Sequence, residues 1–498
     1  MSRLRSPAGI SVSPIAYENF QGLDTSRDEV GLDTGEKQHF VTCNNAHCDF
    51  RGNLVRDPGS NVYEGVNEGQ IEHMRFFGKD RVAWAQKTGR GIDLKSQNNI
   101  DKIDAFPITA RVTSPNFDRK TIFFARGQTP TWFDGFKFKD NSSKADLKPA
   151  FGVAVQQRLA VAGITNKPTQ IHFSRVDDGT IFADDEDVNN VEVTRGAFLD
   201  IANQLNTADD ITGLGVLEKN RLVVFTNDQG IIFKIDPDLT KWEIEDRANV
   251  TIGCMSHNTI VNAGADLLFC SRSGVHSVRR SVTNGISVFT VPLSEKIDIL
   301  YRSLVKQVED QTKINAVFDP DENQYHVFFP ITESLSKRLT FTISPAKQIE
   351  SKWSTATFLN ARCGAFLGGR LVYGTSGGIH EILNIEDVGE ATPEIEVITP
   401  TLWLGSITDV TTIHSIILQA AGTGTLLVEI RDTYTNEIIY SQTLEIEDQV
   451  VDDSFSDNPL PQQYERKVER RATGVRIVFK SLGTGLLRVV GFALYVRN

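Results

Sequence analysis

Soft metal ligands gather in one short stretch near the N-terminus. Four imidazole and thiol side chains, of the kind that bind zinc, lie within ten residues: His39, Cys43, His47 and Cys48. Four residues separate the two cysteines, unlike the short spacings of zinc fingers, and no second ligand pair follows. In a strand, alternate side chains point to opposite faces, so these groups could hardly converge. We therefore expect no metal site here.

A second candidate metal site is acidic. Residues 319–323 read Asp-Pro-Asp-Glu-Asn, which resembles the start of a calcium loop. Such a loop has glycine at its sixth position and glutamate at its twelfth, but this chain has Gln324 and Pro330 there. We expect a hairpin turn between two strands instead.

Enzymatic motifs are weak throughout the chain. Residues 174–182 faintly resemble the Asp-box turn of sialidase-like propellers, but the segment occurs once. A glycosidase needs two carboxylates about 5–10 Å apart, and no acidic pair is singled out. No nucleophile elbow, phosphate-binding glycine loop or His-Glu-x-x-His segment is present. We expect no enzymatic activity, no catalytic residue and no cofactor.

One segment near the C-terminus is strongly charged. Residues 447–472 are acidic in their first part and basic in their last, and we expect a polar loop. One interpretation is a solvated loop. The other is a contact arm to a neighbouring subunit, with opposite charges meeting across the interface. Under the second interpretation the interface residues are Asp452, Asp453, Arg466, Arg470 and Arg471.

The elements that would position these residues repeat along the chain. Seven short apolar segments flanked by turns begin 37 to 63 residues apart. A unit of three or four strands at this period is typical of a β-propeller blade, so we expect about six to eight blades. The segments are Val82–Trp84, Ile122–Ala125, Leu159–Gly163, Leu222–Phe225, Leu267–Cys270, Tyr325–Phe329 and Leu371–Gly374.

We expect an all-β chain in three parts. Residues 1–57 are an N-terminal extended arm followed by a hairpin, and residues 58–395 are the propeller with insertions. From residue 396 to residue 498, longer alternating strands predict an antiparallel β-sandwich. Apolar residues on one face predict a helix within 294–311. The arm, residues 1–40, is expected to be disordered or to extend over a neighbouring subunit.

Composition limits the classes of function. The net charge of −12 argues against a protein that grips nucleic acid through its phosphates. The five cysteines are an odd number at irregular positions, which indicates buried or free thiols in a reducing cytoplasm. No secretory signal or membrane-spanning apolar run is visible. We expect assembly in the cytoplasm without membrane insertion.

The order of segments resembles that of tail nozzle proteins of short-tailed bacteriophages, also called tail tubular protein B or tail hub proteins. The similarity covers about residues 15–290. It begins with Asn-Phe-Gln-Gly-Leu-Asp at 19–24 and Arg-Gly-Asn-Leu-Val-Arg-Asp-Pro-Gly-Ser at 51–60. It continues through the strands near 156–174, 211–225 and 252–275. The chain departs from the family pattern at Asp57, usually basic, and at Leu23, where a second glycine is usual.

The resemblance implies a structural role in the virion. Nozzle proteins form a sixfold ring below the portal and adaptor, extend the DNA ejection channel, and help retain or gate the genome. The implied partners are further copies in a homohexamer, the portal or adaptor ring, tail fibres or needle, and genomic DNA passing without sequence recognition. No catalytic residue comes with the family. Deleting the arm should then impair ring assembly while leaving the monomer folded.

Two other classes of function remain open. The first is a carbohydrate-binding or carbohydrate-cleaving propeller that acts in recognition of a host receptor. It predicts an aromatic-lined pocket with paired carboxylates. The second is an intracellular propeller scaffold of a bacterium, with no role in a virus particle.

Overall fold

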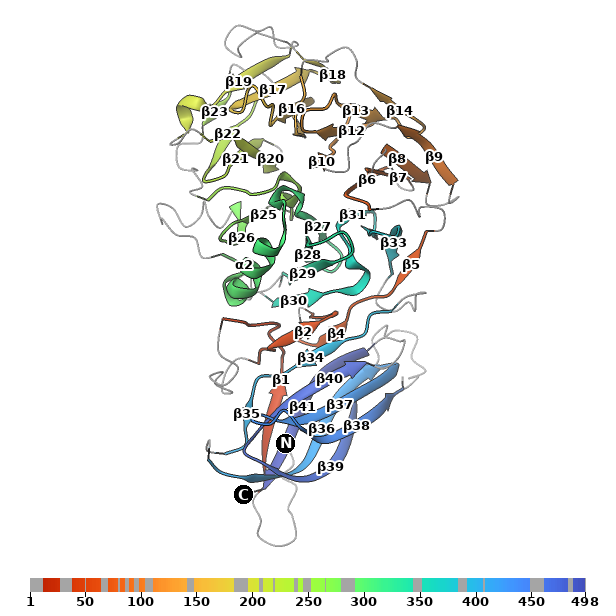
Figure 1. The fold of residues 1–498 in the computed structure, drawn as a ribbon, viewed down its shortest axis with the longest axis vertical. Helices are drawn as coiled ribbons and strands as arrows, with labels where there is room; N and C mark the ends of the chain where they lie inside the picture. The colour runs from red at the N-terminus through yellow and green to blue at the C-terminus, as the bar shows by residue number, and fades with distance from the viewer. Residues whose placement is uncertain are drawn as a thin grey trace.

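The computed structural model of the 498-residue chain is drawn in Figure 1. A β-propeller forms one end of the molecule and a β-sandwich the other, and both chain termini lie at the sandwich end. The structure describes residues 12–26, 38–49, 51–63, 70–78, 81–85, 89–93, 98–103, 111–140, 147–182, 196–205, 209–217, 220–236, 241–244, 252–264, 266–278, 292–343, 352–383, 392–405, 408–447, 461–481 and 487–497.

Seven antiparallel sheets follow one another in the described part of the propeller. The first four contain β6 (His73–Phe77), β7 (Arg81–Ala85), β8 (Gly89–Asp93) and β9 (Asn98–Ile103); β10 (Val112–Thr113), β11 (Asn116–Phe117), β12 (Lys120–Ala125), β13 (Thr131–Phe133) and β14 (Phe138–Asp140); β15 (Phe151–Val155), β16 (Arg158–Ala162), β17 (Gln170–Arg175), β18 (Asp178–Phe182) and β19 (Ala197–Asp200); and β20 (Ile211–Leu217), β21 (Arg221–Thr226), β22 (Gly230–Lys234) and β23 (Glu243–Ile244).

The remaining three sheets complete the ring. They contain β24 (Val261–Asn262), β25 (Leu267–Ser271) and β26 (Gly274–Ser277); β27 (Asn315–Asp319), β28 (Gln324–Pro330), β29 (Ser336–Thr342) and β30 (Lys352–Ala356); and β31 (Cys363–Leu367), β32 (Arg370–Gly374) and β33 (Ile379–Ile382). Each predicted apolar segment overlaps the second strand of a blade, because that strand is covered on both faces by the neighbouring blades. The predicted propeller is confirmed, with seven blades in the described residues.

The propeller closes with a strand from the N-terminal side. β5 (Ser60–Val62) pairs with β33 as the last strand of the seventh blade, although about 320 residues separate them in the chain. The first strand of each blade contacts the next blade, and β31 of the seventh blade contacts β6 of the first. The ring is therefore closed by the chain itself, because the seventh blade combines strands from both ends of the propeller segment.

Small residues let the first strands approach one another. A Cβ atom added at Gly213 would lie 2.5 Å from Cδ1 of Ile260, and one at Gly364 would lie 2.8 Å from Cγ1 of Val317. Both distances are shorter than real Cβ contacts, so a side chain at either glycine would push neighbouring blades apart. Both glycines thus have a packing role between neighbouring blades.

The sandwich has two antiparallel sheets. One contains β1 (Val12–Glu18), β3 (Ala46–Cys48), β4 (Leu54–Arg56), β36 (Thr411–Gly422), β39 (Gln462–Ala472) and β41 (Leu487–Arg497). The other contains β2 (Thr42–Asn44), β34 (Glu396–Ile398), β35 (Leu402–Trp403), β37 (Gly424–Asp432), β38 (Ile438–Ile446) and β40 (Gly474–Ser481). β2 also pairs in parallel with β30, so this second sheet continues into the sixth blade.

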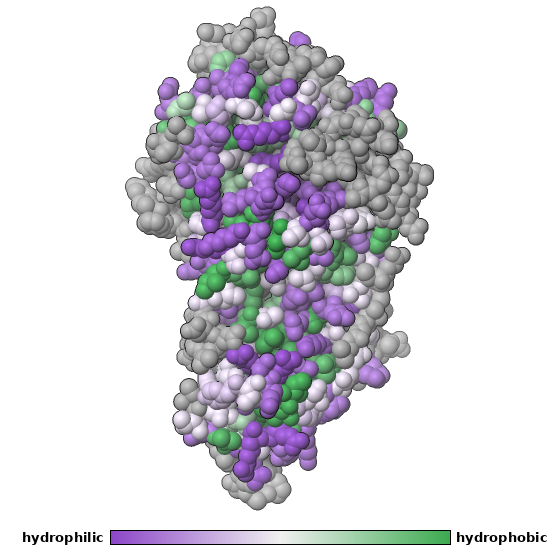
Figure 2. All heavy atoms as spheres, viewed as in Figure 1, coloured by the Kyte–Doolittle hydropathy of each residue, from purple (hydrophilic) through white to green (hydrophobic). Residues whose placement is uncertain are grey.

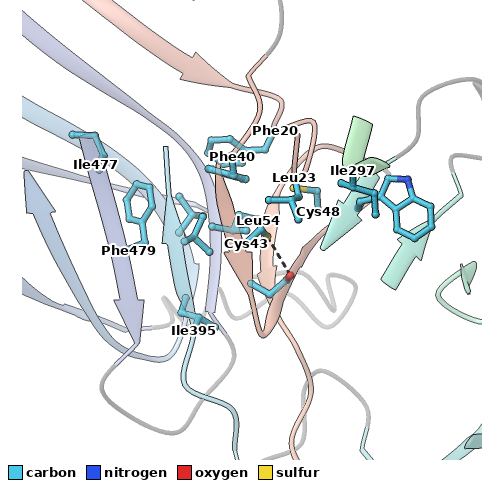
Figure 3. Close-up of a cluster of buried hydrophobic side chains, with 14 of the residues drawn as sticks. Phe20, Leu23, Phe40, Cys43, Cys48, Leu54, Ile297, Ile395, Ile477 and Phe479 are labelled. Atoms are coloured by element: carbon cyan, nitrogen blue, oxygen red, sulfur yellow. Dashed lines mark hydrogen bonds between the residues drawn. The ribbon is translucent and has the colours of Figure 1, made fainter. Parts of the chain in front are cut away.

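The N-terminal arm is the largest difference from the sequence-based expectation. We expected it to be disordered or to reach a neighbour, but β1 pairs along its whole length with β41 of the same chain. Phe20, Leu23 and Phe40 are buried between the propeller and the sandwich (Figure 3). Together with Ile297 and Phe479 they belong to one apolar core that spans both parts. The described part of the arm therefore joins the two parts of its own chain.

Two local expectations are also resolved. The predicted helix is α2 (Asp298–Gln307), preceded by the 3₁₀ turn η6 (Glu295–Ile297), and its buried side chains are Tyr301, Leu304 and Val305. The predicted loop over 447–472 is wrong in its last part, because β39 occupies Gln462–Ala472 and pairs with β36. The run of charges concealed this strand, since only Val468 and Ala472 are buried in it. The described residues also include the 3₁₀ turns η3 (Ala202–Gln204), η5 (His257–Thr259), η7 (Gln311–Lys313) and η8 (Phe358–Asn360).

Candidate functional site

The candidate interface residues lie on an edge strand of the sandwich. β39 is the last strand of its sheet and pairs only with β36 among the described elements. Arg466, Arg470 and Arg471 are all exposed on it, and so is Lys467. Charged side chains on an edge strand oppose uncontrolled pairing with other strands, and they also make a surface that can recognise an acidic partner.

The two acidic members of the predicted interface are not placed. Asp452 and Asp453 lie outside the described residues. Within β39 the carboxylates of Glu465 and Glu469 are exposed among the basic groups. The described strip is therefore mainly basic in a chain whose net charge is −12.

A buried ionic network was missed by the sequence reasoning. Oδ1 of Asp57 lies 2.9 Å from Nδ1 of His47, and its other oxygen accepts a hydrogen bond from Arg338. Nη1 of Arg338 also donates to the Tyr373 hydroxyl at 2.9 Å, and its guanidinium stacks on the Tyr373 ring. Asp57, His47 and Arg338 are all buried.

The network connects three parts of the fold. His47 lies on β3 and Asp57 follows β4, whereas Arg338 lies on β29 of the sixth blade and Tyr373 on β32 of the seventh. Burial alone would raise the pKa of Asp57, but the Arg338 and His47 side chains hold that pKa below its usual value. The Asp57 carboxylate is thus charged and fully engaged, as expected of a structural ion pair.

The cavity beside this network is small. Its volume is about 60 Å³, and Asp319, Asp321 and Glu322 line it with Tyr373. Burial raises the pKa of Asp319, which is a property of many general acids. However, ligand pockets usually have about 300–1,000 Å³, so this space holds only about two water molecules.

The two candidate metal segments have structural roles. Asp319 ends β27, and its Oδ1 accepts a hydrogen bond from the Asp321 amide at 2.9 Å in the turn to β28, which confirms the predicted hairpin. Cys43 donates to the Ala46 carbonyl, as the dashed line in Figure 3 marks, and His47 faces Asp57. Among the described residues, no group of three His, Cys, Asp or Glu side chains could hold a metal ion. All five cysteines are free and buried, as expected.

Comparisons with known proteins find only distant structural similarity. No family model and no curated protein matches the chain. It is similar to the WD40 β-propeller domain of Doa1, with 9% identity, a TM-score of 0.40, and coverage of 66% of this chain and 97% of that chain. For YCF48 bound to D1 peptide, the identity is 10%, the TM-score 0.38 and the coverage 66% and 95%.

A third structure matches a longer part of the chain. The extracellular domain of the putative hybrid two component system BT3049 from B. thetaiotaomicron has 8% identity and a TM-score of 0.43, and the match covers 85% of this chain and 60% of that one.

In the described part of the chain, none of the helices has the length and apolar character needed to cross a membrane.

Three buried histidines predict acid sensitivity. Burial lowers the pKa of His73 to about 3 and holds the pKa values of His257 and His326 well below the usual value. Below about pH 6.5 an unfolded chain binds protons at histidine, whereas the folded chain keeps these three histidines uncharged. The folded state therefore has its full stability above that pH and loses stability as the pH falls. We expect the free energy of unfolding to decrease by about 2 kcal/mol per histidine between pH 7.5 and pH 5.

Urea denaturation at pH 7.5, 6.5 and 5 measures this effect. The variant His326→Gln removes one of the three groups and should reduce the pH dependence by about a third. A free energy of unfolding that stays constant over this range, in the unaltered chain, would contradict the assignment of neutral buried histidines.

Proposed function

We propose that this chain is a structural, non-enzymatic subunit of a bacteriophage tail nozzle. In this role it forms a homohexameric ring below the portal or adaptor, with tail fibres or a needle as further partners. The ring extends the channel through which genomic DNA leaves the virion. The observation that carries the proposal is the ordered set of nozzle-like segments in the sequence, from residue 19 to about residue 275.

The positions of these segments support the proposal. Residues 19–24 lie at the junction of propeller and sandwich, where Leu23 donates its amide to the Trp353 carbonyl at 2.8 Å. Residues 51–60 lead from β4 to β5, which closes the propeller. The first two segments that resemble the family thus connect and close the fold.

The two departures from the family pattern have local physical reasons. Asp57, in place of a basic residue, is the buried partner of Arg338. Leu23, in place of a second glycine, fills the core at the junction and is 2% exposed. Both side chains are buried within the chain, so neither is available to contact a neighbouring subunit in the proposed ring.

The surface offers a contact for ring assembly at β39. Its exposed basic side chains can meet acidic groups of a neighbouring subunit, which the net charge of −12 makes abundant. On the face in Figure 2, hydrophilic residues predominate at the propeller end, and apolar ones are scattered from the junction to the sandwich. We therefore expect the ring contact to be mainly electrostatic and weakened by salt.

Negative-stain electron microscopy and mass photometry test the proposal. We expect sixfold rings with an open centre, alone or with an adaptor ring, and loss of rings in Arg466→Glu/Arg470→Glu. Because both side chains are exposed, the thermal unfolding of this variant should be unchanged. The matched control is Arg302→Glu/Lys306→Glu on the exposed face of α2, which should still form rings. Monomers under all conditions, even with the adaptor, would refute the ring.

A further inference from the structure

A cavity of about 410 Å³ lies where the first strands of the blades meet. Its lining includes residues from β6, β15, β20, β24, β27 and β31. The cavity therefore lies on the axis of the propeller. Its volume falls in the range of about 300–1,000 Å³ that is usual for small-molecule sites.

The lining of this cavity is part polar and part apolar, and it contains no acidic residue among those described. Its charged side chain is Arg75 on β6, which is exposed and forms no hydrogen bond or ion pair with another described residue. Two amides of the wall are less available. Nδ2 of Asn258 donates to the Val112 carbonyl at 2.9 Å, and Nδ2 of Asn315 is buried without a partner within the described residues. The described wall thus presents one positive charge and no negative charge.

A second guanidinium lies beside the wall. Nη2 of Arg111 donates to the Thr212 carbonyl at 3.3 Å, and its guanidinium carbon lies 4.9 Å from the centre of the Phe151 ring. Burial lowers the pKa of Arg111 to about 10, so the group stays charged at neutral pH. The Asp310 carboxylate opposes this lowering of the Arg111 pKa, and the Arg126 guanidinium adds to it.

The two histidines of the wall add no charge to the cavity. Nε2 of His73 bonds to the Ser114 hydroxyl at 2.7 Å, and Nδ1 of His257 accepts the Leu214 amide at 3.2 Å. His257 also stacks on Phe151, with ring centres 4.9 Å apart. Both rings are uncharged at neutral pH because of burial and the neighbouring arginines.

No described carboxylate pairs with Arg75, so its guanidinium is available to an anion that enters the cavity. Arg75 is accessible from the cavity, and its planar guanidinium can bind a carboxylate or a phosphate with two hydrogen bonds. We propose that the axial cavity binds a small molecule through an oxyanion group, either a carboxylate or a phosphate, held by Arg75 with Arg111 beside it.

Titration calorimetry of the full chain, at constant ionic strength and with chloride as the background anion, tests this proposal. Inorganic phosphate and citrate are the two probes. We expect saturable binding of at least one of them, and the tighter probe identifies which oxyanion the cavity prefers. If neither phosphate nor citrate gives a saturable heat of binding, the proposal is overturned.

Variants locate the binding. Arg75→Gln should weaken the tighter probe at least tenfold, and Arg111→Gln should weaken it less, whereas the exposed Arg302→Gln should leave it unchanged. If Arg75→Gln does not fold, Arg75→Lys retains the charge and should bind more weakly than the unaltered chain. If Arg75→Gln binds the tighter probe as well as the unaltered chain does, the binding occurs elsewhere. The same follows if both Arg75→Lys and Arg111→Gln keep the affinity of the unaltered chain. These outcomes do not depend on whether the chain forms rings.

Discussion

Replacing Arg338 by methionine is expected to destabilise the chain by about 3–5 kcal/mol. The change leaves the buried Asp57 carboxylate with His47 as its remaining side-chain partner, and it removes the hydrogen bond to Tyr373. A charge that stays buried after its partner is lost pays the full cost of desolvation. The loss should appear in urea denaturation as a lower midpoint with an unchanged slope.

Two comparisons separate this effect from the loss of an ordinary ion pair. Arg302→Met breaks the exposed pair with Asp298, where Nε and Oδ1 lie 2.8 Å apart, and should cost below about 0.5 kcal/mol. Asp57→Asn/Arg338→Met removes both charges and should recover part of the stability lost in Arg338→Met. If Arg338→Met is as stable as Arg302→Met, the network does not hold the hairpin to the blades.

The propeller could be predicted from the sequence because its repeat is local. Each blade has a second strand that is apolar and short, such as Leu222–Phe225, and turns mark both ends of it. β38, from Ile438 to Ile446, is likewise one of the longer alternating strands that were expected after residue 396. A single sequence reveals an element when the hydrophobic pattern of that element is visible within its own residues and the adjacent turns.

The misjudged elements depend on partners far away in the chain. β1 is a strand because β41 pairs with it, and the sequence between residues 12 and 18 gives no sign of that partner. Asp57 stood out in the sequence only as a departure from the family pattern, but its main contact is Arg338, 281 residues further on. β39 was concealed because an edge strand with two exposed faces has charges where an alternating pattern is expected.

The axial cavity illustrates the same limit for sites. Gly215 and Ala316 of the first strands line the cavity. Arg75 and Arg111 had no motif around them, because the seven blades bring their groups together only in the closed ring. Residues that meet on the axis of the propeller come from different blades, so no fixed spacing in the sequence relates them.

Deleting residues 1–40 is expected to abolish cooperative folding, and not only ring assembly. The deletion removes β1 and four side chains that are at most 2% exposed: Tyr17, Phe20, Leu23 and Phe40. Each is worth about 1.5–3 kcal/mol of burial, so their total approaches the 5–15 kcal/mol that stabilises a typical domain. Circular dichroism during heating should show a broad transition at much lower temperature, or aggregation during expression.

A shorter deletion supplies the control, because β1 begins at Val12. Removing residues 1–11 leaves every described contact of the arm in place and should keep the unfolding temperature unchanged. The single change Phe20→Ala should cost about 3–5 kcal/mol, as for other fully buried aromatic side chains. A chain without residues 1–40 that unfolds cooperatively at the normal temperature would mean that this segment adds nothing to its own core. In that case the arm would be free to act between subunits.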